Sequence, residues 1–276
     1  MADLTGVYAK IDRAYFHALD LTKKIGVALD PQTHRFVAAR DGKPSKLVYR
    51  IVGIPEVKSE WSLIFGDFLT NLRAALDYLA CQLAQLEGAS TCESTYFPIY
   101  DSSLNRSGNP RSVQINGVTN QDVIDALIAA QPYTAVETHG HPLEETALHT
   151  LNTLVNHDKH RLLLVTMHAL HMDVSWWEVP EGQQSPEVRL DLGALEDQSE
   201  AAWFDFGDSE PYPGFDPHLS LTVCLRDRGG LASLPLPELM RTLGGEVEHE
   251  IGLRFAPFFG RSFRHDALRS WREVAG

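Results

Sequence analysis

The chain has 276 residues, of which 43% are hydrophobic and 22% are charged, which is typical of a globular protein that can bury a core. Its formal net charge of −13 disfavours non-specific binding to nucleic acid, including double-stranded DNA, because such binding needs a basic surface. The cysteines, Cys81, Cys92 and Cys224, are odd in number and widely spaced, which argues against a disulfide framework and favours the cytoplasm. Since no apolar run reaches the ~18 residues of a membrane span and no signal peptide is visible, we expect no membrane association.

In the first part of the chain, apolar residues recur every three or four positions over 5–30, which predicts a helix. Two β-rich runs within 35–54 flank an Asp-Gly turn and predict a hairpin. The longest helix is predicted at 59–87. Its apolar stripe consists of Trp61, Phe65, Phe68, Leu72, Leu76, Leu79, Leu83 and Leu86. A stripe this wide predicts the central helix of a bundle.

In the rest of the chain, "TYFPIY" at 95–100 is compatible with a short edge strand, and helical patterns return over 120–162 and 235–256. Residues 163–225 carry β-rich runs separated by turn residues. Helices and strands are thus segregated rather than alternating, which predicts an α+β fold, a helical bundle packed with an antiparallel β-sheet. No clear linker splits the chain, so we expect a single domain over 1–276.

Two polar clusters interrupt the predicted apolar stripes. Asp158 lies one turn after Val155 on the buried face of its helix, and an isolated buried carboxylate is costly, so it should have a partner. On the long helix, Arg73 and Asp77 are four residues apart and can pair. We predict that Arg73 also reaches Asp158 in a charge-assisted pair, so that Arg73, Asp77, Asn156 and Asp158 meet between the two helices.

Lys159, His160 and Arg161 follow Asp158 directly and border the predicted pair. Basic residues are favoured in the last turn of a helix by its dipole, so an ordinary helix end is one interpretation. The other is a working site in which His160 acts as acid or base while Lys159, Arg161 and Arg73 bind phosphate. Exposure separates the two, because a working site needs His160 and a cation open to a cleft.

The sequence contains no dinucleotide-binding, P-loop or α/β-hydrolase motif, so we expect no cofactor. His139 and His141 share one loop, whereas His168 and His171 fall in a predicted strand and would point to opposite faces. Since neither pair matches a known zinc-ligand spacing, we expect no metal site. A metal-dependent hydrolase is therefore the weakest of the functional alternatives.

The segments "FGDFLTNLRAALDYLACQL" and "LNTLVNHDKHRLLLV", with "TYFPIY" between them, resemble an uncharacterised family of bacterial proteins that is common in actinomycetes. This resemblance covers roughly a third of the chain and implies no activity. The same helices are similar to HEPN domains, helical bundles that are often dimeric and that cleave RNA without a metal. The HEPN motif is an Arg, four to six residues and then a His on a helix that lines the site.

In this chain Tyr78 follows Arg73 after four residues where the motif has His, and a tyrosine of ordinary pKa is a poor base at neutral pH. The HEPN resemblance implies a homodimer that acts on RNA or a small nucleotide. The candidate catalytic residues are His160, Arg73 and Asp158, and the candidate substrate-binding residues are Lys159, Arg161, Asn156, Asp77 and Tyr78. The alternative is a non-enzymatic binding protein, or a stress or defence accessory protein, whose polar cluster is structural.

Overall fold

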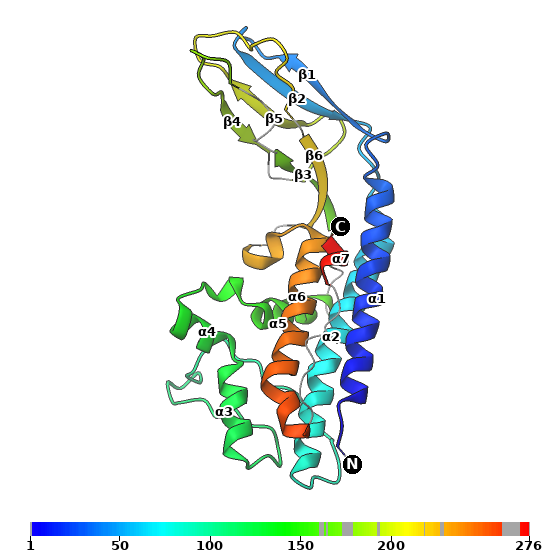
Figure 1. Ribbon diagram of the computed structural model, residues 1–276, viewed down its shortest axis with the longest axis vertical. Helices are drawn as coiled ribbons and strands as arrows, with labels where there is room; N and C mark the ends of the chain where they lie inside the picture. Colours follow the sequence, from blue (N-terminus) through cyan, green and yellow to red (C-terminus); the bar gives the residue numbers. More distant parts are fainter. Residues whose placement is uncertain are drawn as a thin grey trace. The chain divides into compact units, whose positions relative to one another are not determined.

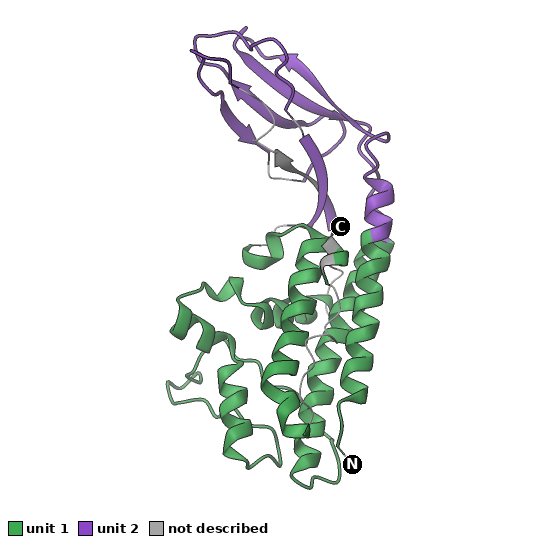
Figure 2. Cartoon of the chain, in the orientation of Figure 1, with its two compact units in different colours: residues 1–22, 60–163, 227–276 green, residues 23–59, 164–226 purple. Residues whose placement is uncertain are grey.

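The computed structural model describes residues 2–159, 163, 165–172, 179–191, 194–217, 219–226, 229–260 and 271–275 (Figure 1). The fold is α+β, as predicted, with antiparallel strand pairing throughout the described sheets. The chain divides into two compact units (Figure 2). The helical unit comprises Met1–Thr22, Glu60–Leu163 and Asp227–Gly276, and the strand unit comprises Lys23–Ser59 and Leu164–Arg226. The expectation of a single domain over 1–276 stays a prediction.

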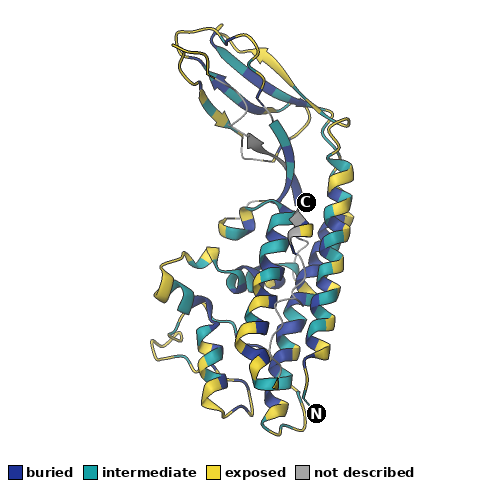
Figure 3. Ribbon diagram, viewed as in Figure 1, coloured by how far each residue is buried: buried dark blue, intermediate teal, exposed yellow. Residues whose placement is uncertain are grey.

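Two long helices, α1 (Thr5–Ala28) and α2 (Ser59–Leu86), match the predicted ranges closely. The α2 stripe is buried as predicted (Figure 3). Every residue of the stripe is at most 1% exposed except Leu86 at the helix end, which is 44% exposed. Each large apolar side chain buried in this way contributes about 1.5–3 kcal/mol, so the stripe rather than helix propensity holds α2 in place. Neither α2 nor any other helix in the described ranges is long and apolar enough to cross a membrane.

The predicted helical region 120–162 contains α3 (Gln121–Ala129), α4 (Pro132–His139), a 3₁₀ turn (Leu143–Glu145) and α5 (Ala147–Asp158). The Asn120 side chain caps α3 by accepting a hydrogen bond from the backbone N–H of Asp122. Helix α4 begins at a proline and ends at Gly140, whose φ of 71° is left-handed. The helical pattern over 120–162 is thus divided among several elements, and the residues after Pro142 form the 3₁₀ turn before α5.

Near the end of the chain, α6 (Leu236–Glu250) continues into a π turn (Ile251–Phe255) and a 3₁₀ turn (Ala256–Phe259), and α7 spans Arg272–Ala275. Gly244 lies inside α6, where a glycine lowers the stability of a helix relative to alanine. In the structure the Trp271 ring packs directly over Gly244, where an added Cβ would collide with it, and the Trp271 Nε1–H donates to buried Glu248 Oε2 at 2.7 Å. The glycine therefore makes room for an aromatic anchor.

In the strand unit, β1 (Arg35–Arg40), β2 (Lys46–Val52), β5 (Glu200–Asp205) and β4 (Glu187–Leu190) form an antiparallel sheet in that order. Strands β3 (Val165–Met172) and β6 (Leu219–Leu225) pair separately. The predicted hairpin and antiparallel pairing are confirmed, but the strands form two sheets. The core of the larger sheet consists of Tyr49, Ala202, Phe204, Phe206 and Tyr212.

A disulfide joins Cys81 of α2 to Cys92, with 5.3 Å between their Cα atoms, so the expectation of no disulfide is wrong for this pair. The chain turns back after α2 at Gly88, whose φ of 92° is left-handed, and this turn brings two cysteines that are 11 residues apart together. Cys224 is free and buried, and burial raises the pKa of its thiol to about 11. The cytoplasmic location stays a prediction, because disulfides are commonest in oxidising compartments.

Candidate functional site

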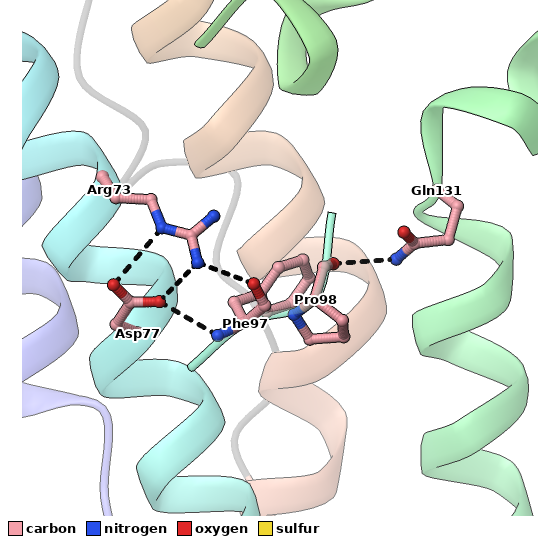
Figure 4. Close-up of polar contacts among 5 residues, drawn as sticks. All are labelled: Arg73, Asp77, Phe97, Pro98 and Gln131. Atoms are coloured by element: carbon pink, nitrogen blue, oxygen red, sulfur yellow. Dashed lines mark hydrogen bonds and ion pairs between the residues drawn. The ribbon is translucent and has the colours of Figure 1, made fainter. Parts of the chain in front are cut away.

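Residues 95–100, the "TYFPIY" segment, bond through backbone groups to side chains of α2 and do not form a strand, so the predicted edge strand is wrong. The backbone N–H of Phe97 donates to Asp77 Oδ1 at 2.9 Å, and Arg73 Nη2 donates to the Phe97 carbonyl at 2.7 Å (Figure 4). Two charged side chains of one helix thus take the place of a neighbouring strand. This satisfies backbone groups that would otherwise be buried without partners.

The other side of the segment is held by Gln131, the residue before α4, which is 1% exposed. Its Nε2 donates to the carbonyls of Pro98 at 3.0 Å and Leu127 at 2.9 Å, and its Oε1 accepts the backbone N–H of Tyr100 at 2.9 Å. A buried amide that uses both of its ends in this way fixes the segment firmly. The segment is therefore fastened from α2 and from the α3–α4 junction (Figure 4).

The predicted pairing of Arg73 with Asp77 is confirmed. Arg73 Nη2 lies 2.8 Å from Asp77 Oδ1 and its Nε lies 3.3 Å from Oδ2, which makes the pair bidentate. The two side chains are 15% and 34% exposed, so the pair is partly desolvated and stronger than a surface pair. The second terminal nitrogen, Nη1, bonds to no described residue and keeps its two N–H groups available.

A pocket of ≈ 360 Å³ adjoins this pair and is lined by α2, the 95–100 segment and α5. It brings together four of the predicted site residues. These are Arg73, Asp77, Asn156 and Lys159. Asn156 and Lys159 are exposed, and neither forms a hydrogen bond or ion pair with the described part of the chain that competes with a ligand. Of the four residues predicted to meet between the two helices, Arg73, Asp77 and Asn156 line this pocket, whereas Asp158 does not.

Three further polar residues, Tyr96, Tyr100 and Asn152, line the pocket and were not predicted as site residues. Asn152 lies one turn before Asn156, so the helical period alone could have placed it on the same face. Tyr96 is 59% exposed, and the Arg111 guanidinium lies 4.4 Å from the centre of the Tyr100 ring. No sequence signal places the tyrosines here. Their position depends on the hydrogen bonds that side chains of α2 and Gln131 make to the backbone of the 95–100 segment.

Asp158, the last residue of α5, lies against Gly66 of α2, where an added Cβ would be 2.7 Å from Asp158 Oδ2. Gly66 precedes Arg73 by two helical turns, about 10 Å along the axis, so the predicted Arg73–Asp158 pair is wrong. No described residue forms a hydrogen bond or ion pair with Asp158. Burial and, second, the charge of Asp67 raise the pKa of Asp158 above its ordinary value.

Tyr78 also lies outside the pocket. Its ring faces α1, where an added Cβ at Gly6 would be 3.2 Å from Tyr78 Cδ2, and Lys10 Nζ is 5.7 Å from the ring centre. The reason is the helical period, because one residue beyond Asp77 is a rotation of about 100° around α2. The remaining two predicted site residues, His160 and Arg161, lie outside the described residues.

In the part of the chain that the structure describes, no three His, Cys, Asp or Glu residues lie closely enough together to hold a metal ion. His139 and His141 lie near each other, with ring centroids 6.1 Å apart. His168 and His171 belong to β3, and their side chains lie outside the description.

The pocket presents a guanidinium nitrogen, an ammonium group and two side-chain amides, with two tyrosines beside them. These groups donate hydrogen bonds, and guanidinium and ammonium groups are the usual protein partners of phosphate and carboxylate oxygens. The arrangement therefore suits a small oxyanion. The chain matches no protein-family model, no curated protein and no solved structure.

Proposed function

We propose that the helical unit binds a small phosphate-bearing ligand of the nucleotide class in the pocket beside Arg73. The observation that carries the proposal is the convergence of Arg73, Lys159, Asn152 and Asn156 on one cavity of ≈ 360 Å³. That volume falls within the range of small-molecule sites, about 300–1,000 Å³. The exposed Tyr96 offers a flat ring on which a base could stack.

The charges favour a small ligand over a long polyanion. The whole chain carries a net charge of −13, which repels extended nucleic acid, whereas the pocket holds two cations against the single carboxylate of Asp77. Arg73 is held in place before any ligand arrives, because Asp77 and the Phe97 carbonyl bind its other nitrogens. A donor that is already fixed loses little conformational entropy on binding.

The enzymatic form of the proposal is an HEPN-like enzyme that acts on RNA or a nucleotide. His160 would transfer the proton, since it follows pocket residue Lys159 directly, and Arg161 would add a third cation. Asp158 is left out of the catalytic set because it faces Gly66. Tyr78 is left out because it faces α1.

A specific observation favours the non-enzymatic alternative. Arg73 and Asp77 use most of their hydrogen-bonding capacity within the protein, on each other and on the backbone of Phe97. In this alternative the cluster fastens the 95–100 segment, and the pocket beside it binds no phosphate. Binding measurements distinguish the phosphate site from the structural cluster, because only the phosphate site requires that a phosphate-bearing ligand binds in the pocket.

The test is isothermal titration calorimetry of the full chain with inorganic phosphate, AMP and UMP. Lys159→Met removes the exposed ammonium, so we expect nucleotide affinity to fall about tenfold while the melting temperature stays the same. Lys43→Met, at an exposed lysine in the turn between β1 and β2, is the matched control and should bind as the parent does. If none of the three anions binds at millimolar concentration, the proposal fails.

The enzymatic form has its own test. His160→Ala should abolish cleavage of a short RNA or of a nucleotide, by a factor of about 10²–10⁴, while the calorimetric affinity is kept. Retained cleavage in His160→Ala would mean that His160 does not transfer the proton. Cleavage absent in the parent chain despite tight binding would leave a binding protein without this chemistry.

A further inference from the structure

The helical unit holds a second and larger cavity, ≈ 620 Å³ in volume, which shares no lining residue with the pocket beside Arg73. We name it the α4–α6 cavity, because α4 and α6 supply much of its wall together with the 3₁₀ turn before α5. Part of the wall is made of small apolar side chains. These include Ala129, Ala130, Ala135 and Ala147. The apolar part of a ligand could therefore lie flat against it.

Carboxylates from two separate elements reach the same cavity. Glu246 and Glu250 come from α6, and Glu145 comes from the 3₁₀ turn. Glu250 is already paired with Arg254, the one Lys or Arg side chain of the cavity lining in the described structure. The side chains of Glu145 and Glu246 form no hydrogen bond or ion pair with any described residue. The cavity therefore presents two uncompensated negative charges beside an apolar wall.

The distribution of these charges argues for an amine rather than a metal ion. Nowhere in the described ranges do three potential ligands, His, Cys, Asp or Glu, gather closely enough to hold an ion, so the cavity carboxylates do not form a metal site. The described lining contains no Trp, Tyr or Phe, so it lacks the aromatic cage that recognises quaternary ammonium groups. Carboxylates from two elements and an apolar wall in the same cavity match a ligand whose ammonium groups are joined by methylenes.

We propose that the α4–α6 cavity binds a linear diamine or polyamine. Its terminal ammonium groups donate hydrogen bonds to Glu145 and Glu246, and its methylenes pack against the alanine side chains. The hydroxyls of Thr138 and Thr242, which also line the cavity, supply further acceptors for the amine N–H groups. The net charge of −13 favours the approach of such a cation. This proposal is independent of phosphate binding beside Arg73.

The test titrates the full chain with spermidine and with putrescine by calorimetry, in the presence of 0.15 M salt to screen non-specific attraction. We expect saturable binding that weakens about tenfold in Glu145→Gln/Glu246→Gln, since each exposed carboxylate contributes modestly. Ala135→Leu fills the cavity without changing any charge and should weaken spermidine binding as well. Glu93→Gln, at an exposed glutamate outside the cavity, is the matched control and should leave the affinity unchanged.

Three results would overturn the proposal. The first is no saturable binding of either amine. The second is an equal loss of affinity in Glu93→Gln and in the double variant, which would mean binding to the acidic surface at large. The third is displacement of spermidine by equimolar Mg²⁺, which would mean a metal site. Circular dichroism checks each variant, and if Ala135→Leu does not fold, the double variant at two exposed positions decides the question alone.

Discussion

Helix α2 meets its neighbours at two places where polar groups enter an apolar contact, and the two places differ. At the first, which we call the Arg73 cluster, Arg73, Asp77 and Gln131 bind one another or the backbone of residues 97–100. At the second, Asp158 rests against Gly66 with no bonding partner among the described residues and with a raised pKa.

The difference shows two ways in which a fold accommodates a polar group within a packed face. The Arg73 cluster does so by hydrogen bonds that use most of its donors and acceptors, and these bonds also position a segment that has no regular structure. The Asp158 contact does so by space, because Gly66 has no side chain and the carboxylate remains partly open to water. The first arrangement should contribute to stability, and the second should cost some.

The largest effect is expected at Gln131, where Gln131→Leu removes hydrogen bonds from Pro98, Leu127 and Tyr100 at a site that is 1% exposed. Buried backbone groups left without partners cost about 1–3 kcal/mol each, so we expect a loss of about 3–5 kcal/mol in urea unfolding. Gln114→Leu, at an exposed glutamine, should change stability by less than about 0.5 kcal/mol. A loss in Gln131→Leu as small as that of the control would mean that the segment is not held by this amide.

The second effect concerns Arg73→Met, which leaves Asp77 and the Phe97 carbonyl without their cation. Breaking a buried pair costs about 3–5 kcal/mol, and the partial exposure of Asp77 reduces our expectation to about 2–3 kcal/mol. Because the two residues act together, Arg73→Met/Asp77→Leu should lose less than the sum of the single variants. Strict additivity of the two losses would contradict the pairing.

The third effect tests the space at Gly66. Gly66→Ala places a Cβ within 2.7 Å of Asp158 Oδ2, so the carboxylate must move, and we expect a loss of about 1–2 kcal/mol. The loss should shrink in an Asp158→Ala background, where alanine's better helix propensity remains. Gly26→Ala in α1 meets no atom within 4 Å and should stabilise by up to about 1 kcal/mol. An equal loss at Gly66 in both backgrounds would mean that Asp158 does not occupy this space.

The smallest effect has the opposite sign. The folded state raises the pKa of Asp158 above 3.8, so folding favours the protonated form, and stability falls as the pH rises from about 3.8 through the folded pKa. Asp158→Asn cannot ionise, so at pH 7 it should stabilise the protein by less than about 1 kcal/mol, because the group is partly solvated. Thermal unfolding at pH 7 and near pH 3 measures this, and the gain should vanish at the lower pH. Destabilisation at pH 7 would mean that the charged form has a partner.

The helix and strand patterns of the sequence predict the α+β class, the bounds of α2 and the 35–54 hairpin, because these follow from local periodicity and turn residues. The same spacing rule predicts the Arg73–Asp77 pair, since both residues belong to one helix. Tyr78, a candidate from the HEPN resemblance, lies outside the pocket because one step along α2 turns its side chain towards α1. Periodicity thus predicts relations within an element well and gives little about which element a side chain will meet.

Three features depended on the tertiary structure. The Cys81–Cys92 bond requires the chain reversal at Gly88, the 95–100 segment requires partners from two helices, and Asp158 requires the space at Gly66. The sequence by itself determined the elements and the faces they bury, because burial of an apolar stripe is a local pattern. Only the tertiary structure decided which polar groups meet, because hydrogen bonds between elements depend on the register of their packing.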